Sequence, residues 1–310
     1  AGPLRLLARE IYEKFLENGI RCNLITGEEV IPNVDKFGNV AGISSGTIEM
    51  IPTTKPMDVC IIDEIQMISD PRRGEAWTNA LLGVQTREIY CCGEASAVPL
   101  VQKIAQITGD EVVIKHYERL GDLKPSPGIV SLLSKLRKGD CLVAFSKLKI
   151  LTYKRDIEHY TDLKVGGVYG ALPPEVRASE AAKFNSGEYN VLVASDAIGM
   201  GLNLKINRVV FATTKKFDGV QSVPLTSLQI KQIAGRAGRY SSSGPLVGYY
   251  TAMHSRDMEV IKRGMKGSVE LLQMATVWPT QSVWLNYVTE FSSRHDLTDI
   301  ITFLTKEDRQ

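Results

Sequence analysis

Short apolar runs recur along the chain as far as about residue 253, and each run ends in polar or small residues. The runs are rich in Val and Ile and have the length of buried strands, at residues 59–62, 88–92, 141–145, 190–194 and 208–212. Because they are apolar on both faces, they predict a parallel sheet covered by helices on two sides. Helical patterns of suitable length lie between or beside them, at 4–17, 74–82, 98–106, 128–136, 147–160 and 175–184. The chain is therefore predicted to have an α/β fold.

The polar positions divide this pattern into parts. Two prolines and two glycines fall within residues 120–128, which is typical of a linker. The strand-rich segments on either side have the same architecture, and strand signals stop after residue 253. We therefore predict a first domain at 1–118, a linker at 119–128, a second domain at 129–254, and a helical segment at 255–310.

Composition limits the class of protein. A chain of 310 residues, 44% of them hydrophobic, has enough material for two cores. The net charge of +2 indicates that any nucleic-acid surface is a local groove. The five cysteines include no C-x-x-C pattern and are predicted to be reduced thiols. The four histidines show no metal-ligand spacing. No apolar run approaches the length of a membrane span, so a membrane partner is not expected; the first residues resemble neither a signal nor a transit peptide.

Gln232, Arg236 and Arg239 are spaced i, i+4 and i+7 among small residues. On a helix this spacing places one amide and two guanidiniums on one face. Planar guanidiniums can hold phosphate oxygens through paired hydrogen bonds, so the pattern suits a polyphosphate ligand. The alternative is a closely packed helix whose arginines lie in solvent.

Asp63 and Glu64 follow a predicted strand directly. A carboxylate at the tip of a strand can hold Mg²⁺ beside a nucleotide, and a second one can accept a proton from an attacking water. The alternative is an ordinary pair of acidic residues in a loop.

Together, residues 63–66 (Asp-Glu-Ile-Gln), 195–204 and 232–239 resemble motifs II, V and VI of superfamily-two helicases with two RecA-like domains. The Gln at the end of motif II and residues 198–204 are similar to the Suv-three family, the mitochondrial degradosome RNA helicases. Weaker matches to other helicase motifs lie at 2–8, 26–29, 47–50, 93–96 and 143–146.

The resemblance implies an ATP-dependent RNA helicase that unwinds RNA for degradation in the mitochondrial matrix. It also implies a partner exoribonuclease, and it leaves DNA open as an alternative to RNA. Asp63 would bind Mg²⁺ through water, Glu64 would activate the attacking water, and Arg236 and Arg239 would act as arginine fingers on ATP. The remaining nucleotide-binding candidates are Gln66, Asp196, Gly199 and Gln232.

The resemblance also implies contacts to the RNA backbone, which carry no sequence information. The candidates are Arg5, Thr26, Gly27, Thr47, Ser146 and Thr213. For any single Ser or Thr among them, a role as a cap or turn residue is the better explanation.

No G-x-x-x-x-G-K-[ST] phosphate loop occurs in these 310 residues, and the match to the helicase motifs begins at residue 2. The expectation is a first domain without its first strand and phosphate loop, and therefore a chain that is catalytically incomplete. The alternative function is a non-hydrolysing RNA-binding or scaffold fragment of the same fold.

Overall fold

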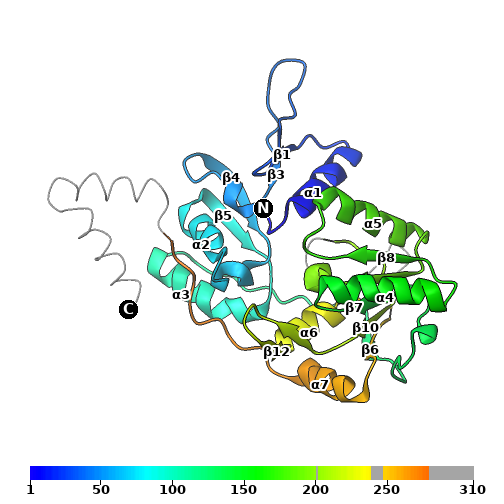
Figure 1. Ribbon diagram of the computed structural model, residues 1–310. Coiled ribbons are helices and arrows are strands. Elements are labelled where there is room, and N and C mark those ends of the chain that lie inside the picture. Colours follow the sequence, from blue (N-terminus) through cyan, green and yellow to red (C-terminus); the bar gives the residue numbers. More distant parts are fainter. Residues whose placement is uncertain (200–201, 239–246, 279–310) are drawn as a thin grey trace, which may run out of the picture. The chain divides into compact units, whose positions relative to one another are not determined.

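The computed structural model describes residues 1–199, 202–238 and 247–278, and it divides into two compact units (Figure 1). Unit 1 comprises residues 1–50 and 112–271, and unit 2 comprises 51–111 and 272–310.

A six-stranded sheet forms the centre of unit 1. Its order is β6 (Leu123–Pro125), β13 (Gly248–Ala252), β10 (Arg208–Phe211), β7 (Asp140–Val143), β9 (Val191–Ala194) and β8 (Val165–Val168). All neighbouring strands are parallel, and β7, β9 and β10 are buried along their whole length. The predicted α/β fold with a doubly covered parallel sheet is therefore confirmed.

Alternate residues of these strands belong to two cores, as the pleat requires. On one face, Val143, Leu192 and Phe211 join a cluster with α5 (Pro174–Ser186), α6 (Ser227–Ala234) and α7 (Ser255–Lys266). On the other, Leu142, Val193 and Val210 join Ile150 and Ile157 of α4 (Lys147–Tyr160).

The helix predicted at 128–136 is wrong. The segment contains a single turn of 3-10 helix, Leu133–Lys135. The backbone N–H groups of Ser126 and Val130 donate to the carbonyls of Tyr250 and Ala252 at 2.8 and 2.9 Å, so this stretch follows β13 in an extended form. Pairing with a neighbouring strand has taken the hydrogen bonds that a helix needs.

A second, smaller sheet follows α1 (Arg5–Glu17) in unit 1. Its three strands lie in the order β2 (Val30–Ile31), β1 (Asn23–Ile25) and β3 (Ser44–Gly46). The hydroxyl of Ser45 donates to the carbonyl of Ala8 at 2.8 Å and ties β3 to α1, while Leu6 of α1 packs against the core on the α5 face. A further hairpin joins β11 (Lys215–Phe217) to β12 (Ser222–Pro224).

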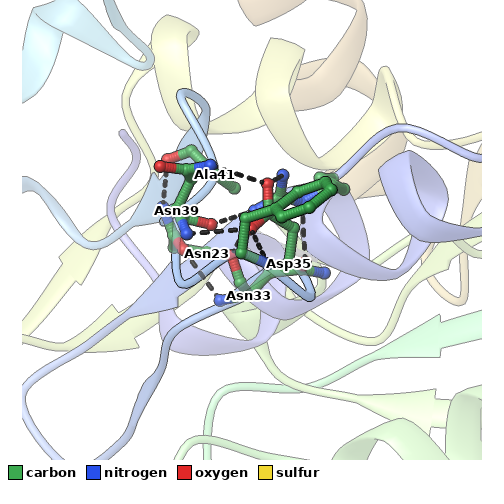
Figure 2. Close-up of polar contacts among 7 residues, drawn as sticks. Asn23, Asn33, Asp35, Asn39 and Ala41 are labelled. Atoms are coloured by element: carbon green, nitrogen blue, oxygen red, sulfur yellow. Dashed lines mark hydrogen bonds and ion pairs between the residues drawn. The ribbon is translucent and has the colours of Figure 1, made fainter.

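The hairpin between β2 and β3 ends in a turn that is held by Asp35 (Figure 2). One carboxylate oxygen of Asp35 accepts from the N–H groups of Phe37 and Asn39, at 2.8 and 2.9 Å. The other accepts from the guanidinium of Arg21 at 3.1 Å and from the side chain of Asn39. Asn23 binds both strands of the same hairpin, through the N–H of Asn33 and the carbonyl of Ala41.

Unit 2 contains the parallel pair β4 (Pro56–Ile62) and β5 (Gln85–Cys91), with α2 (Gly74–Gly83) and α3 (Val98–Thr108). Both predicted strands and both predicted helices in this part of the chain are confirmed. Trp77, Ile62 and Ile68 are fully buried there. Of the helical segment predicted at 255–310, α7 is present, residues 267–278 contain no helix, and 279–310 lie outside the described residues.

The Asp35 turn leads to a prediction about pH. The N–H of Asn39, chiefly, together with Phe37 and Arg21, holds the pKa of the Asp35 carboxyl below its ordinary value. A lowered pKa means that the carboxylate stabilises the turn above its unfolded pKa, and that this contribution is lost as the pH falls through the folded pKa. A carboxyl NMR titration should therefore give a midpoint for Asp35 below the ordinary range of aspartate.

The variant Asp35→Asn should raise amide hydrogen exchange at Phe37 and Asn39 at neutral pH, since a neutral amide is a weaker acceptor than a carboxylate. The matched control is the turn of the other hairpin, where Asp218 accepts from the N–H groups of Val220 and Gln221. Exchange at those two amides should stay unchanged. An unchanged rate at Asn39 contradicts the assigned role of Asp35.

Candidate functional site

Asp63 and Glu64 lie in a tight turn between β4 and the 3-10 helix Ile65–Ser69. The buried indole of Trp77 donates to the backbone carbonyl of Asp63 at 2.9 Å, which anchors the backbone from which the first carboxylate extends. Glu64 has φ 54° and ψ 49°, a left-handed conformation that is uncommon for residues other than glycine. Such strain persists only where the surroundings fix it, and it gathers at functional sites.

Gln66 joins this turn to the segment that follows β5. Its side-chain N–H₂ donates to the carboxylate of Glu64, and its side-chain oxygen accepts from the N–H of Glu94 at 3.2 Å. A Cβ on Gly93 would lie 2.4 Å from the same oxygen, so only glycine fits there. Gln66 is 8% exposed. Its amide both donates and accepts, and these two bonds tie the motif II turn to residues 93–96, one of the weaker helicase matches.

Cys92 lies beside Asp63 where the two strands end. Its N–H donates to the carbonyl of Ile62, and its carbonyl accepts from the N–H of Ile65, at 2.8 and 2.9 Å. Partial burial first, and then the Asp63 carboxylate, raise the pKa of the Cys92 thiol. The thiol is exposed, so alkylating reagents can reach it. Its rate of alkylation depends on its thiolate fraction, and therefore on the charge at Asp63.

The structure corrects the expected arginine helix. α6 begins with a capping box between Thr226 and Gln229 and ends at Ala234, so Gln232 is helical and Arg236 is not. The N–H of Arg236 donates to the carbonyl of Ile233, three residues back, and the chain then leaves the helix. Arg239 lies outside the described residues.

The reason for this early end is a contact with the strand region. Ala237 pairs with Ile206 in an isolated parallel bridge, and the N–H of Gly238 donates to the carbonyl of Ile206 at 2.7 Å. Gly238 has φ 60°, and a Cβ there would meet the backbone of Gly248 at 2.2 Å. The glycines of motif VI therefore end the helix instead of lining it. Gln232 and Arg236 do not share a helical face.

Residues 196–199, from motif V, form a short 3-10 helix that contacts α6. Ile198 is buried in the same core as Ile233. Asp196 is 53% exposed at its side chain and lies 3.9 Å from the ammonium of Lys216. The structure thus brings the elements that carry Asp196, Gly199 and Gln232 together within unit 1.

Four of the predicted RNA-binding residues gather around the small sheet: Arg5, Thr26, Gly27 and Thr47. Gly2 pairs with Thr47 in a parallel bridge, and the N–H of Thr47 donates to the carbonyl of Ile25. Arg5 forms an ion pair with Glu28. The hydroxyl of Thr26 is bound to the backbone of Glu29, so its observed contact is that of a turn residue, and Gly27 is exposed.

Ser146 and Thr213 follow β7 and β10, which are neighbours in the large sheet. Since Val143 pairs with Phe211, Ser146 and Thr213 lie at the same end of the sheet, after the carboxyl ends of their strands. Ser146 is exposed and makes no side-chain cap to α4. Thr213 is half-buried, and its hydroxyl accepts from the N–H of Lys215 at 3.2 Å.

The sequence-based interpretation missed Arg119, which it assigned to the linker. Its guanidinium donates to backbone carbonyls of Gly235 and Gly238, on either side of Arg236. Nothing in the sequence pattern marks this pairing, because the acceptors are backbone groups more than a hundred positions away.

Within the part of the chain that the structure describes, no three His, Cys, Asp or Glu side chains are grouped as a metal site. Of the helices described, none has both the length and the apolar character needed to cross a bilayer.

Comparison with solved structures shows which known fold the chain shares. Dbp5 from S. cerevisiae bound to RNA and ADP BeF3 aligns with a TM-score of 0.60 over 94% of this chain and 79% of that chain, at 15% identity. The DUF1998 helicase MrfA bound to DNA and AMPPNP aligns with a TM-score of 0.61 over 99% of this chain and 50% of that chain, at 13% identity. The chain therefore shares the RecA-like α/β fold of these structural neighbours.

Two family comparisons then cover most of the sequence. The DEXQ-box helicase domain of Suv3 matches residues 1–117, and the helicase conserved C-terminal domain matches residues 127–241. The chain belongs to the Suv3 family of helicases.

The relatives include the mitochondrial ATP-dependent RNA helicase SUV3 of Candida albicans, which is 58% identical over 98% of this chain and 42% of its own length. SUV3 of Saccharomyces cerevisiae is 52% identical over 94% of this chain and 40% of its own length. DExH16 of Arabidopsis thaliana is 42% identical over 97% of this chain and 52% of its own length. The chain thus spans about half or less of these curated relatives.

The contact between Cys92 and Asp63 gives a prediction that needs no enzymatic activity. Asp63→Asn removes a negative charge that raises the pKa of the Cys92 thiol, so the thiolate fraction at pH 8 should increase. Alkylation of Cys92 should then be faster by a factor of about 2 to 5, because each unit of pKa changes the thiolate fraction up to tenfold. Mass spectrometry of iodoacetamide-treated protein measures the rate.

Cys91 is the internal control, because burial and the neighbouring thiols Cys60 and Cys92 raise its pKa to about 11, without Asp63 among the causes. Its slow rate should not change. An equal rate at Cys92 in both proteins refutes the proximity of the two groups.

Proposed function

We propose that this chain is the core of an ATP-dependent RNA helicase, and that ATP hydrolysis drives movement along RNA. The observation that carries the proposal is the Asp63–Glu64–Gln66 turn at the end of a parallel strand, in which Trp77 anchors the backbone of Asp63 and the buried Gln66 amide holds the Glu64 carboxylate. Ligands of open α/β sheets bind at this end. The names of the relatives support the activity.

The residues present fit Mg²⁺. Magnesium in nucleotide sites takes one or two carboxylates and fills its other positions with phosphate oxygens and water. A single half-buried Asp63 at a strand end meets that need. When bound, the ion would neutralise part of the negative charge on the phosphates of ATP.

The chain's own groups have distinct proposed roles. Glu64 accepts a proton from the attacking water, and Gln66 holds the Glu64 carboxylate in position. Arg236 and Arg239 neutralise the charge that develops on the γ-phosphate. Gln232, Asp196 and Gly199 contact the nucleotide.

We propose that the RNA lies against the backbone and hydroxyl groups at the strand ends of unit 1, among Arg5, Thr26, Gly27, Thr47, Ser146 and Thr213. Such contacts are independent of sequence. The grouping of Arg5 with Gly27 and Thr47, and of Ser146 with Thr213, supports this placement. DNA stays an alternative on this chemistry, and stimulation of turnover by RNA against DNA distinguishes the two.

We further propose RecA-like domains at 1–118 and 129–254 joined by a linker at 119–128, which agrees in outline with the two family matches. A mitochondrial location, a role in RNA degradation and a partner exoribonuclease are proposed from the family. The names of the relatives, which include the word mitochondrial, support the location.

Glu64→Gln tests the activity. In the full-length protein that contains these residues, RNA-stimulated ATP turnover should fall by a factor of about 10² to 10⁴, since the general base is lost and the shape is kept. RNA affinity, measured by fluorescence anisotropy, should stay within about threefold of the unchanged protein, because binding and proton transfer are separate events.

Glu88→Gln is the matched control, an exposed glutamate on β5 that hydrogen-bonds Tyr90. Its turnover should equal that of the unchanged protein. Tight RNA binding with no ATP turnover in the unchanged full-length protein favours the alternative, a non-hydrolysing RNA-binding scaffold.

A further inference from the structure

A single guanidinium holds the turn that carries Arg236. Arg119 donates from Nη1 to the carbonyl of Gly235 at 2.7 Å, and from Nη2 to the carbonyls of Ala237 and Gly238, the latter at 2.9 Å. Its Nε donates to the carbonyl of Gly121 at 2.8 Å, two positions along its own segment. All three nitrogens of one planar group therefore donate to two segments of backbone.

The end of a helix makes this arrangement favourable. The last carbonyls of α6 and of the turn after it have no partner within the helix, and the helix dipole is negative at this end. Arginine supplies several donors in a fixed plane together with a positive charge, and charged hydrogen bonds are stronger than neutral ones. Lysine has the charge without the fork.

Arg236 has little freedom once this contact is made. The carbonyl before it, at Gly235, and those after it, at Ala237 and Gly238, are held by Arg119. The bridge to Ile206 anchors the same turn from its other side. The backbone on both sides of Arg236 is therefore held by Arg119 together with this bridge.

We propose that Arg119 is a positioning residue for the arginine finger Arg236. The proposal rests on the proposed helicase function, in which Arg236 meets the γ-phosphate. Arg119 lies between the two family matches, which end at 117 and begin at 127, so it joins the segment linking the domains to the arginine turn. A conformational change in that segment would move Arg119 and, with it, the backbone that carries Arg236.

The expected effect is kinetic. An arginine finger acts only when it reaches the transferred phosphate, and a misplacement of about 1 Å can lower a rate about 10²-fold. Arg119→Ala in the full-length protein should lower kcat for ATP about 10- to 100-fold. The KM for ATP should change less than about threefold, because the finger acts mainly in the transition state.

Two further measurements separate positioning from general stability. Guanidinium ion at low millimolar concentration should restore part of the kcat of Arg119→Ala, since it can occupy the vacated site, and Arg119→Lys should retain intermediate activity. Arg21→Ala is the matched control: Arg21 also donates to two backbone carbonyls in unit 1, those of Asn33 and Asn39. Its kcat should be unchanged and insensitive to guanidinium.

A measurement that does not depend on ATP hydrolysis distinguishes a failure of the proposed helicase function from a failure of the proposed role of Arg119. Amide hydrogen exchange at Arg236 and Gly238 should rise in Arg119→Ala and stay unchanged in Arg21→Ala. If the unchanged protein hydrolyses no ATP, the proposed function fails, and faster exchange at Gly238 still supports the anchoring by Arg119.

A folded Arg119→Ala with full kcat, or with unchanged exchange at Gly238, overturns the proposal. So does a loss of kcat that merely follows the loss of folded protein and that guanidinium does not relieve. Should Arg119→Ala fail to fold, Arg119→Lys and Arg119→Gln take its place, with a smaller kcat expected for the glutamine variant.

Discussion

The register between β7 and β10 is the constraint from which the arrangement of unit 1 follows. At the amino ends of these strands, the guanidinium of Arg208 and the carboxylate of Asp140 form a buried pair, with 2.9 Å between Nε and Oδ1. Asp140 also accepts from the N–H of Arg137, which satisfies the pair further. Breaking such a pair by removing one partner typically costs about 3–5 kcal/mol, so a slipped register is strongly disfavoured.

This register also determines which residues lie together at the carboxyl ends of the strands. Parallel strands end at the same side, so the segments that carry Ser146, Asp196 and Thr213 emerge beside one another. The same rule operates in unit 2, where Ile62 pairs with Cys91 and brings Asp63 beside Cys92. In both units the residues proposed for function follow the ends of paired strands.

The motif VI segment illustrates how backbone hydrogen bonds override local spacing. Its small residues permit a helix, and i, i+4, i+7 spacing would align Gln232, Arg236 and Arg239. Instead, the bridge from Ala237 to Ile206 and the close approach of Gly238 to Gly248 draw the chain out of the helix. The carbonyls released by this early end become the acceptors of Arg119. Small residues serve here for close approach between backbones.

The sequence by itself determined the apolar strands β4, β5, β7, β9 and β10, most of the helices between them, and the Asp63–Glu64 turn. Strands that are buried on both faces appear in the sequence as continuous apolar runs, and their ends appear as polar residues. The sequence did not determine β8, whose two glycines carry no apolar signal, or the extended stretch after residue 125, whose partner β13 lies far along the chain. Only the tertiary structure decided where α6 ends, what Gln66 binds and that Arg119 meets the arginine turn. Those outcomes depend on backbone carbonyls and N–H groups, which every residue type shares, so residue identity cannot encode which of them will meet.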